Sequence, residues 1–433
     1  MLLGLYSYFA YFLKRNDFSQ LLFLYSGLFL GSFFLIEKNK NRFWFLAGLA
    51  LVFRLIFIGA TPNLSQDFYR FIWDGRLLAE GINPFLSTPK NLLEENFSAI
   101  AQTQILVDGM GSLNASNFSN YPPVSQFIYG IAGFFAKKSI LGSVVIMRLI
   151  LITADFGTLY FGKKLLEKLQ LPSYRIFWFI LNPFIILELT GNLHFEGLLL
   201  FFFIAGIYFL IQKKWILAAI LIGFSISTKL LPLLILPLFF NYFRKKFTSG
   251  LLKLIGFYTL IFITVFLTFL PFLSDNLIQN YSDSVGLWFS TFEFNASVYY
   301  IIRWIGFQTV GWNIIGTVGK ILPIIIFLGI LALTFFRKNY PKENLLQNML
   351  LAFCLYFLLS TTVHPWYLAT PLLISIFTKF KFMIFWSFLV ILSYSAYANL
   401  HFEENLYLVA LEYILVASFF CYEIFYQKHN LVD

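Results

Sequence analysis

Residues 65–85, SQDFYRFIWDGRLLAEGINPF, bring two aspartates, two arginines and a glutamate into a chain that is mostly apolar. At 3.6 residues per turn, Asp67, Arg70 and Asp74 share one face of a helix for which Ser65 is a suitable N-cap. A carboxylate that accepts a proton and a cation that binds phosphate are the groups needed to attack a phosphate ester with a hydroxyl. An amphipathic helix lying on a membrane, with solvated charges, is the alternative. Its apolar face would be Phe68, Phe71 and Ile72.

Other ionisable groups occur inside or beside apolar runs, where charge is costly and function is the usual reason for it. Lys229 is the sharpest case, because Pro232 follows it and predicts a break between two half-helices. Such a break directs an ammonium and a helix N-terminus at an anion such as phosphate. A lysine that snorkels to the membrane surface is the alternative. Glu188, His194 and Glu196 are further cases, and for each of them the alternative is a buried group paired with a neighbouring helix.

Composition defines the class of protein. The 433 residues are 59% hydrophobic and 12% charged, which predicts an all-α, polytopic integral membrane protein. The net charge of +10 lies largely in short Lys/Arg clusters between apolar runs, as the positive-inside rule predicts, and this argues against nucleic acid as a partner. Cys354 and Cys421 lie in apolar segments and are expected to be small core residues.

The basic clusters also predict the topology. Residues 38–42, 163–175 and 244–246 read as cytoplasmic, which leaves residues 61–121 and 272–312 as two long outer regions. We expect one transmembrane domain over residues 1–433, with about 11–14 transmembrane or re-entrant helices. The first outer loop should carry amphipathic helices and the catalytic residues, because loops of that length are usually functional or disordered.

One segment breaks the alternation of this topology. Residues 122–136 form an apolar run of about fifteen residues, shorter than the ~20 that a membrane span needs. Two full crossings after residue 121 would place Lys163 on the outer side, against its basic surroundings. The run is therefore either re-entrant or bounded differently from this prediction.

The remaining motifs restrict the chemistry. No Walker loop, GxSxG, GxGxxG, HExxH or CxxC occurs in the sequence. A divalent ion, Mg²⁺ or Mn²⁺, between Asp67 and another outer carboxylate stays open, although no metal ligand set is predicted. An enzyme acting on a lipid-linked substrate fits the outer charges better than a transporter, which would place its ions near the midplane and often show repeated halves. A lipid-linked glycan transporter or flippase is the alternative.

A set of motifs extends this prediction. The stretch 65–85 followed by YPP resembles the first outer loop of GT-C glycosyltransferases, nearest to the GPI mannosyltransferase I type and its bacterial polyprenyl-phosphate-mannose-dependent relatives. Further matching segments follow in order to about Leu373: NPFIILELTGNLHFEGLLL, STKLLPLLILP, FEFNASVYY and HPWYLATPLL. The eukaryotic enzymes carry a DxD in this loop, whereas Ser65 stands two residues before Asp67 here. That departure puts a metal-dependent reaction in doubt.

The resemblance implies an inverting transferase that moves a sugar, with mannose as the first expectation, from a polyprenyl-phosphate donor to a lipid-linked or glycan acceptor. Another pentose or hexose is the alternative. The site would face the periplasm, or the lumen in a eukaryote, and the Phe/Lys/Asn/Ile-rich composition favours a bacterial inner membrane. Asp67 matches the catalytic carboxylate of the family and would be the general base.

The candidate substrate-binding residues are Arg70, Asp74, Tyr121, His194, Glu196, Lys229, Arg303, His364, Trp366 and Tyr367. Lys229, Arg70 and Arg303 are the candidate cations for the phosphate leaving group. Asp74 has an equal claim to holding the loop in shape through Arg70. Trp366 and Tyr367 have an equal claim to being aromatic residues of the membrane interface.

Overall fold

The computed structural model describes residues 1–399 and 401–429, which form helices and, within those ranges, no strand. The only pairing of extended backbone in that part of the chain is an isolated β-bridge between Phe294 and Thr362. The expected all-α class is therefore confirmed. The longer helices of the bundle are α2 (Phe18–Lys38), α3 (Phe43–Ile56), α8 (Ile140–Lys168), α11 (Glu196–Ile211), α12 (Trp215–Ile226), α14 (Gly250–Phe269), α17 (Ile315–Phe335), α18 (Lys342–Leu359) and α21 (Leu406–His429).

Shorter elements connect these helices. The two predicted outer regions hold α4 (Asp67–Ala79), α5 (Pro89–Glu94), α6 (Thr103–Ala115), α15 (Leu277–Ser290) and α16 (Val298–Thr309), and α7 (Pro123–Ala136) follows the first of them. The other short α-helices are α1 (Leu2–Tyr11), α9 (Phe177–Ile180), α10 (Pro183–Ile185), α13 (Phe239–Lys246), α19 (Ala369–Ser375) and α20 (Phe382–Leu389). Tighter or wider turns form η1 (Ser173–Ile176), η2 (Ile186–Gly191), η3 (Leu231–Leu238), η4 (Leu270–Phe272), η5 (Pro365–Leu368) and η6 (Val390–Ala398).

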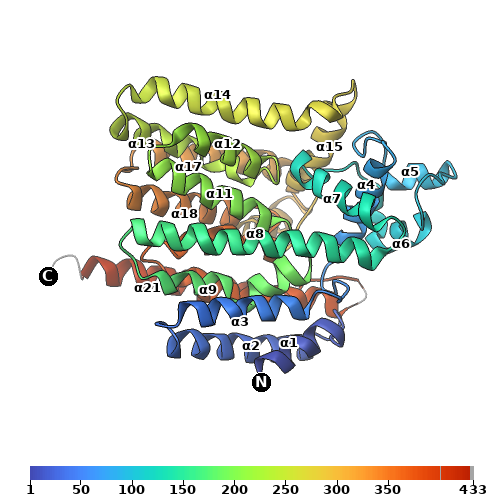
Figure 1. Ribbon diagram of the computed structural model, residues 1–433, viewed down its shortest axis with the longest axis horizontal. Coiled ribbons are helices and arrows are strands. Elements are labelled where there is room, and N and C mark those ends of the chain that lie inside the picture. The colour runs from blue at the N-terminus through green and yellow to red at the C-terminus, as the bar shows by residue number, and fades with distance from the viewer. Residues whose placement is uncertain (400, 430–433) are drawn as a thin grey trace.

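The long helices run side by side along one direction (Figure 1). The short helices of the two predicted outer regions lie at one end of the bundle, and the turns that carry basic clusters lie at the other. Helices α4 to α7 and α15 gather at the right-hand end, whereas the α2–α3 turn, the end of α8, α13 and the C-terminus lie at the left-hand end. The left-hand end therefore carries the basic clusters at residues 38–42, 163–168 and 244–246. The positive-inside rule predicts that this basic end faces the cytoplasm. We call the opposite end, which holds the two predicted outer regions, the outer end.

Five helices are long and apolar enough to cross a membrane, or six if the bent pair Pro183–Gly191 and Glu196–Ile211 is one span, within the described residues. The two halves of that pair meet at an angle of 113°. Four shorter apolar helices, of 10–17 residues, accompany them. A polytopic integral membrane protein of this type agrees with the composition.

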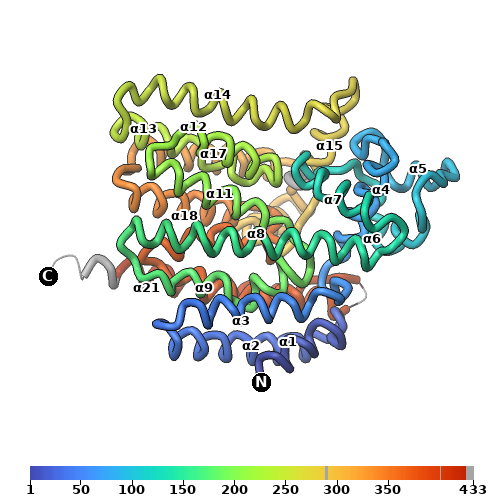
Figure 2. The backbone as a smooth tube through the Cα atoms, viewed as in Figure 1, coloured from blue at the N-terminus to red at the C-terminus, as the bar shows by residue number. Residues whose placement is uncertain are grey.

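Helix α7 resolves the break in the predicted alternation. It lies beside α4 at the outer end, and only the following helix, α8, extends to the opposite end (Figures 1 and 2). The two helices touch backbone to backbone, because a Cβ on Gly75 would lie 2.1 Å from the Tyr129 carbonyl oxygen. A Cβ on Gly133 would likewise lie 2.1 Å from the carbonyl oxygen of Gly75. A single helix, α8, therefore brings Lys163 to the end of the bundle that carries the other basic clusters.

Helix α4 differs from the prediction in two respects. Its N-cap is Gln66 rather than Ser65, whose Oγ instead accepts a hydrogen bond from the Asp67 N–H at 3.2 Å. The apolar face is buried in protein rather than exposed to a membrane, so the interfacial helix is the wrong interpretation. The ring of Phe71, for example, stacks on Tyr129 of α7 with centroids 4.7 Å apart.

A buried arginine fixes the turn that precedes α11. Arg148 of α8 donates hydrogen bonds to carbonyl oxygens at the end of α3 and the end of η2: Phe57, Ile58, Ala60, Thr190 and Gly191. Carbonyl groups freed at helix ends need such donors when they are buried. The break at residues 192–195 is thereby held in place. The cysteines differ from expectation in one case, because Cys354 is buried but Cys421 is exposed.

Candidate functional site

Asp67 is the first residue of α4 and keeps part of its side chain exposed. Its Oδ1 accepts a hydrogen bond from Asn114 Nδ2 at 3.3 Å. Removal of water by the surrounding protein raises the pKa of Asp67, although the charges of Lys229 and Arg15 and the Asn114 hydrogen bond act in the opposite direction. A carboxylate with a raised pKa that substrate can reach is suited to accept a proton.

Lys229 lies at a break in the helical path, as the sequence predicts. Helix α12 ends at Ile226 and η3 begins at Leu231. The Lys229 Nζ lies 2.5 Å from Oε1 of Glu196, the first residue of α11, and 5.8 Å from the centroid of the Tyr367 ring. The lysine is therefore held by a buried carboxylate at the outer side of the bundle, and the snorkelling interpretation is wrong.

Four rings stack in a row beside this pair. The ring centroids of Phe294 and His364 are 5.1 Å apart, those of His364 and Trp366 are 4.6 Å apart, and those of Trp366 and His194 are 3.7 Å apart. The last two pairs are nearly parallel, at 4° and 15°. Trp366 is buried in this stack, so it does not belong to a membrane-interface belt.

Two tyrosines complete the surroundings of Asp67. Burial raises the pKa of Tyr121 and of Tyr367, and the negative charge of Asp67 raises both further. The three groups therefore lie within electrostatic reach of one another. Tyr121 packs edge-on against Phe71 at 5.0 Å, and Tyr367 packs edge-on against His364 at 5.4 Å. Both tyrosines keep part of their surface exposed.

Arg70 and Asp74 form a buried ion pair on α4, the helix that begins with Asp67. Their Nε and Oδ1 atoms lie 2.8 Å apart, and both side chains are almost fully buried. Arg70 Nη1 also donates to the carbonyl oxygens of Asn114 and Asn117, at 2.8 and 2.9 Å. Asp74 Oδ2 accepts from Ser119 and Gln126. The pair therefore holds the end of α6, and with it Asn114, against α4. This arrangement fits the alternative in which Asp74 shapes the loop through Arg70.

Arg303 belongs to a different cluster. Its guanidinium forms an ion pair with Glu293 and lies 4.3 Å from the centroid of the Tyr300 ring. Tyr300 in turn donates a hydrogen bond to Glu404, which also accepts the Asn295 N–H at 2.6 Å. The cluster fixes the backbone beside Phe294, so Arg303 reaches the stacked rings only indirectly.

Glu188, which the sequence singles out together with His194 and Glu196, accepts a hydrogen bond from Tyr394 at 2.5 Å and lies 3.5 Å from His194 Nε2. One residue near the site, Arg15, was not predicted from the sequence. Arg15 lies 3.4 Å above the Tyr397 ring, and its charge lowers the pKa of Asp67. A signal for Arg15 exists, because the predicted topology places the Lys14–Arg15 pair on the outer side, where basic pairs are uncommon.

The metal prediction finds no ligand cluster to support it. Within residues 1–399 and 401–429, no three His, Cys, Asp or Glu side chains come together as a candidate metal site. Asp67 and Glu196 influence each other electrostatically, but Glu196 already binds the Lys229 ammonium. Lys229 is therefore the cation that contacts Glu196 in the described part of the chain.

The fold and site define the class of protein: an all-helical integral membrane protein whose polar groups from distant segments meet at one end. The amino-acid sequence matches the family described as "Alpha-(1->6)-mannopyranosyltransferase, N-terminal domain" over residues 22–243, slightly more than half of the chain. The chain belongs to this family, and the resemblance to GT-C mannosyltransferases is confirmed. The match includes Asp67, His194, Glu196 and Lys229, whereas Arg15 and the Trp366 segment lie outside it.

Two relatives share part of the sequence. The chain is 21% identical over 345 residues to "Alpha-(1->6)-mannopyranosyltransferase A" of Mycobacterium tuberculosis, which covers 73% of this chain and 62% of that protein. It is 25% identical over 148 residues to "Alpha-(1->6)-mannopyranosyltransferase B" of Corynebacterium glutamicum, which covers 34% of this chain and 23% of that protein. The chain therefore spans less than two thirds of the length of these relatives.

Proposed function

We propose that this protein transfers mannose from a polyprenyl-phosphate donor to a hydroxyl of a lipid-linked or glycan acceptor, at the periplasmic face of a bacterial inner membrane. Family membership supports mannosyl transfer. The observation that carries the site assignment is the partly exposed Asp67 carboxylate, within the field of the Lys229 ammonium and beside partly exposed aromatic rings. A base, a cation and flat apolar surfaces are what such a transfer requires.

In the proposed reaction, Asp67 accepts the proton of the acceptor hydroxyl as that oxygen forms a bond to the anomeric carbon. The bond between the anomeric carbon and the phosphate oxygen breaks, and its electron pair stays on the polyprenyl phosphate. The configuration at the anomeric carbon inverts. An α linkage, the kind in the name of the matching family, then requires a β-linked mannose on the donor.

The leaving phosphate needs charge stabilisation more than a proton, because its pKa is low. Lys229 can supply it while remaining bound to Glu196, since an ammonium group has three donors. Glu196 would thus position the cation rather than react. Tyr121 and Tyr367 present exposed ring surface near Asp67, which suits the apolar faces of a sugar.

A transfer assay tests this function. The purified protein is supplied with polyprenyl-phosphate mannose, with other polyprenyl-phosphate sugars, and with lipid extracts as acceptors. Asp67→Asn should lower transfer by about 10²–10⁴-fold, the usual contribution of a general base. Asp108→Asn is the matched control, because Asp108 is an exposed carboxylate on α6 whose partner is Gln104.

Unchanged transfer by Asp67→Asn would remove Asp67 as the base. Transfer from a donor other than the mannosyl lipid would correct the sugar and keep the mechanism. If the wild-type protein transferred no sugar but moved a lipid-linked glycan across liposome membranes, the protein would be a flippase.

A further inference from the structure

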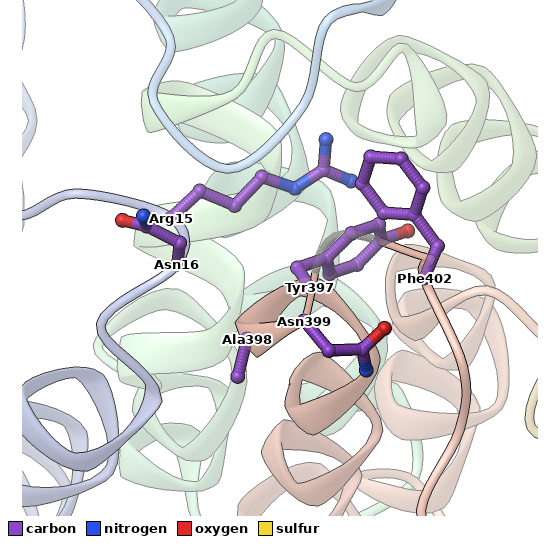
Figure 3. Close-up of a pocket in the computed structure, with 6 residues that line it drawn as sticks. All are labelled: Arg15, Asn16, Tyr397, Ala398, Asn399 and Phe402. Atoms are coloured by element: carbon purple, nitrogen blue, oxygen red, sulfur yellow. The ribbon is translucent and has the colours of Figure 1, made fainter.

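A cavity of about 370 Å³ lies next to the site, and the proposed reaction does not use it. Two segments far apart in sequence form it: the turn between α1 and α2, and the chain that follows η6 (Figure 3). Its volume falls within the ~300–1,000 Å³ of small-molecule sites. The lining residues are Arg15, Asn16, Tyr397, Ala398, Asn399 and Phe402.

Arg15 is the charged group of this cavity. The Asp17 N–H donates to the Lys14 carbonyl oxygen at 3.0 Å, which makes a tight turn around Arg15. Its guanidinium lies 3.4 Å from the centroid of the Tyr397 ring. Figure 3 shows the Arg15 side chain extending towards the Tyr397 and Phe402 rings. The Arg15 Nε is buried and has no hydrogen-bond partner, and in the described part of the chain no carboxylate pairs with it. A guanidinium that stacks on a ring and has no carboxylate partner is suited to bind an anion.

Hydrogen bonds and a ring contact hold the opposite wall of the cavity. The Asn399 Oδ1 accepts the N–H groups of His401 and Glu403, at 3.1 and 2.9 Å. The Asn399 Nδ2 donates to the Glu403 carbonyl oxygen at 2.7 Å. Phe402 packs against Tyr397 with ring centroids 6.0 Å apart. The ring that supports the guanidinium is therefore held in place before any ligand arrives.

The position of Arg15 connects the cavity with the reaction site. Its positive charge acts on Asp67, Glu188, His194 and His364, so it borders the same cluster as Lys229. Glu188 is hydrogen-bonded to Tyr394, and Asp67 to Asn114. Lys229 is in direct contact with Glu196, whereas no carboxylate in the described part of the chain lies within ion-pair distance of Arg15. The Arg15 guanidinium can therefore contact an added anion without first leaving a carboxylate.

We propose that the cavity beside Arg15 binds the phosphate group of a lipid, with the guanidinium as its main contact and the Tyr397 and Phe402 rings against the adjoining carbon chain. The phosphate would belong either to an isoprenoid phosphate substrate or to a glycerophospholipid headgroup. The first source rests on the proposed function, and the second does not. Guanidinium–phosphate pairing is the shared chemistry.

Binding can be measured without turnover. Farnesyl phosphate, a short isoprenoid phosphate, is titrated into the purified protein in a nonionic detergent, and its Kd is measured by calorimetry. Arg15→Gln should weaken binding by at least tenfold, and Arg15→Lys should restore part of it. Lys14→Gln is the matched control, because Lys14 is an exposed cation next to Arg15 in the same turn. An unchanged Kd in Arg15→Gln overturns the proposal.

A second ligand separates the two sources. Dihexanoylphosphatidylglycerol is titrated into the same proteins. Loss of farnesyl phosphate binding alone in Arg15→Gln assigns the cavity to an isoprenoid substrate, and loss of phosphatidylglycerol binding assigns it to a headgroup. Equal thermal unfolding of Arg15→Gln and the wild type excludes misfolding as the cause, and Tyr397→Leu, which removes the supporting ring, provides an independent variant that should also weaken binding.

The binding test can succeed or fail independently of the proposed sugar transfer. Asp108→Asn should bind farnesyl phosphate as well as the wild type does, because Asp108 is exposed on α6 and its partner is Gln104. If Arg15-dependent binding were found in a protein that transfers no sugar from any donor, the proposed function would fail and the phosphate site would remain.

Discussion

The Lys229 Nζ lies 2.5 Å from Glu196 Oε1, and this contact joins the break after α12 to the first turn of α11. Glu196 is almost fully buried, whereas about a fifth of the Lys229 side chain is exposed. The carboxylate thus fixes one side of the ammonium and leaves another side open. A lysine held in this way gives a positive charge of defined position near Asp67.

The Lys229–Glu196 contact predicts different effects on folding and on catalysis. Lys229→Met should leave Glu196 buried without a counter-charge and lower stability by roughly 2–3 kcal/mol, somewhat less than for a fully buried pair. It should also raise the KM for the donor. The double variant Lys229→Met/Glu196→Gln should recover most of the thermal stability but not the activity, because neither charge is then left unpaired.

Thermal unfolding and donor kinetics of the single and double variants check this. Recovery of transfer in the double variant would show that the pair serves stability alone. Lys253→Met, on α14, changes a lysine whose ammonium lies 5.5 Å from the centroid of the Phe247 ring, and it serves as the control.

The fall of kcat/KM at low pH should reflect the protonation of Asp67. Its pKa is raised because the packed surroundings remove water, so protonation begins at a higher pH than for an ordinary aspartate. A base is active only when ionised, and kcat/KM should therefore fall as the pH drops through that raised pKa. Lys229→Met removes a positive charge that lowers this pKa, so the fall should begin at a still higher pH.

His364 provides the comparison. Burial and the nearby positive charges of Lys229 and Arg15 lower the pKa of His364 to about 3, so it is neutral throughout the working range. His364→Gln should change the rate but leave the pH of the acid limb where it was. A shift of the acid limb in that variant would assign the titration to His364.

The sequence was sufficient to predict that ionisable groups from distant segments of the chain gather at one end of the bundle. The cost of charge in an apolar segment and the distribution of basic clusters are local properties, and they grouped Asp67, Glu196, Lys229 and His364 across almost 300 residues of chain. The break at Lys229 was also predictable, because a proline near a lysine interrupts the helix locally.

Partners far apart in sequence were not predictable. Arg70 shares a helical face with Asp67, but its guanidinium already donates hydrogen bonds to Asp74 and to backbone carbonyl oxygens more than 40 residues away in the sequence. Arg303 lies in the second predicted outer region, but its guanidinium forms an ion pair with Glu293. Arg15 was not predicted because it contacts Tyr397, a residue near the other end of the sequence.

Metal removal should leave the reaction intact. Glu196, the carboxylate that acts electrostatically with Asp67, is occupied by Lys229, and Mg²⁺ or Mn²⁺ bind weakly to a single remaining carboxylate. Transfer is measured after treatment with EDTA and again after Mg²⁺ or Mn²⁺ is added. Loss of activity with EDTA and its return with either ion would mean that a metal, rather than Lys229, balances the leaving phosphate.

The contact between α4 and α7 should be intolerant of any side chain at Gly75. An alanine Cβ there would lie 2.1 Å from the Tyr129 carbonyl oxygen, so the two helices would have to separate. Overpacking of this kind costs about 1–3 kcal/mol. Because Asp67 is the first residue of α4, the displacement should reduce transfer as well as thermal stability. Gly48→Ala on α3 is the control, since nothing lies within 4 Å of the added Cβ and alanine favours a helix. Both variants are compared by thermal unfolding and by transfer from polyprenyl-phosphate mannose. If Gly75→Ala matched the wild type in both measurements, the close packing of α7 on α4 would not be what positions the proposed base.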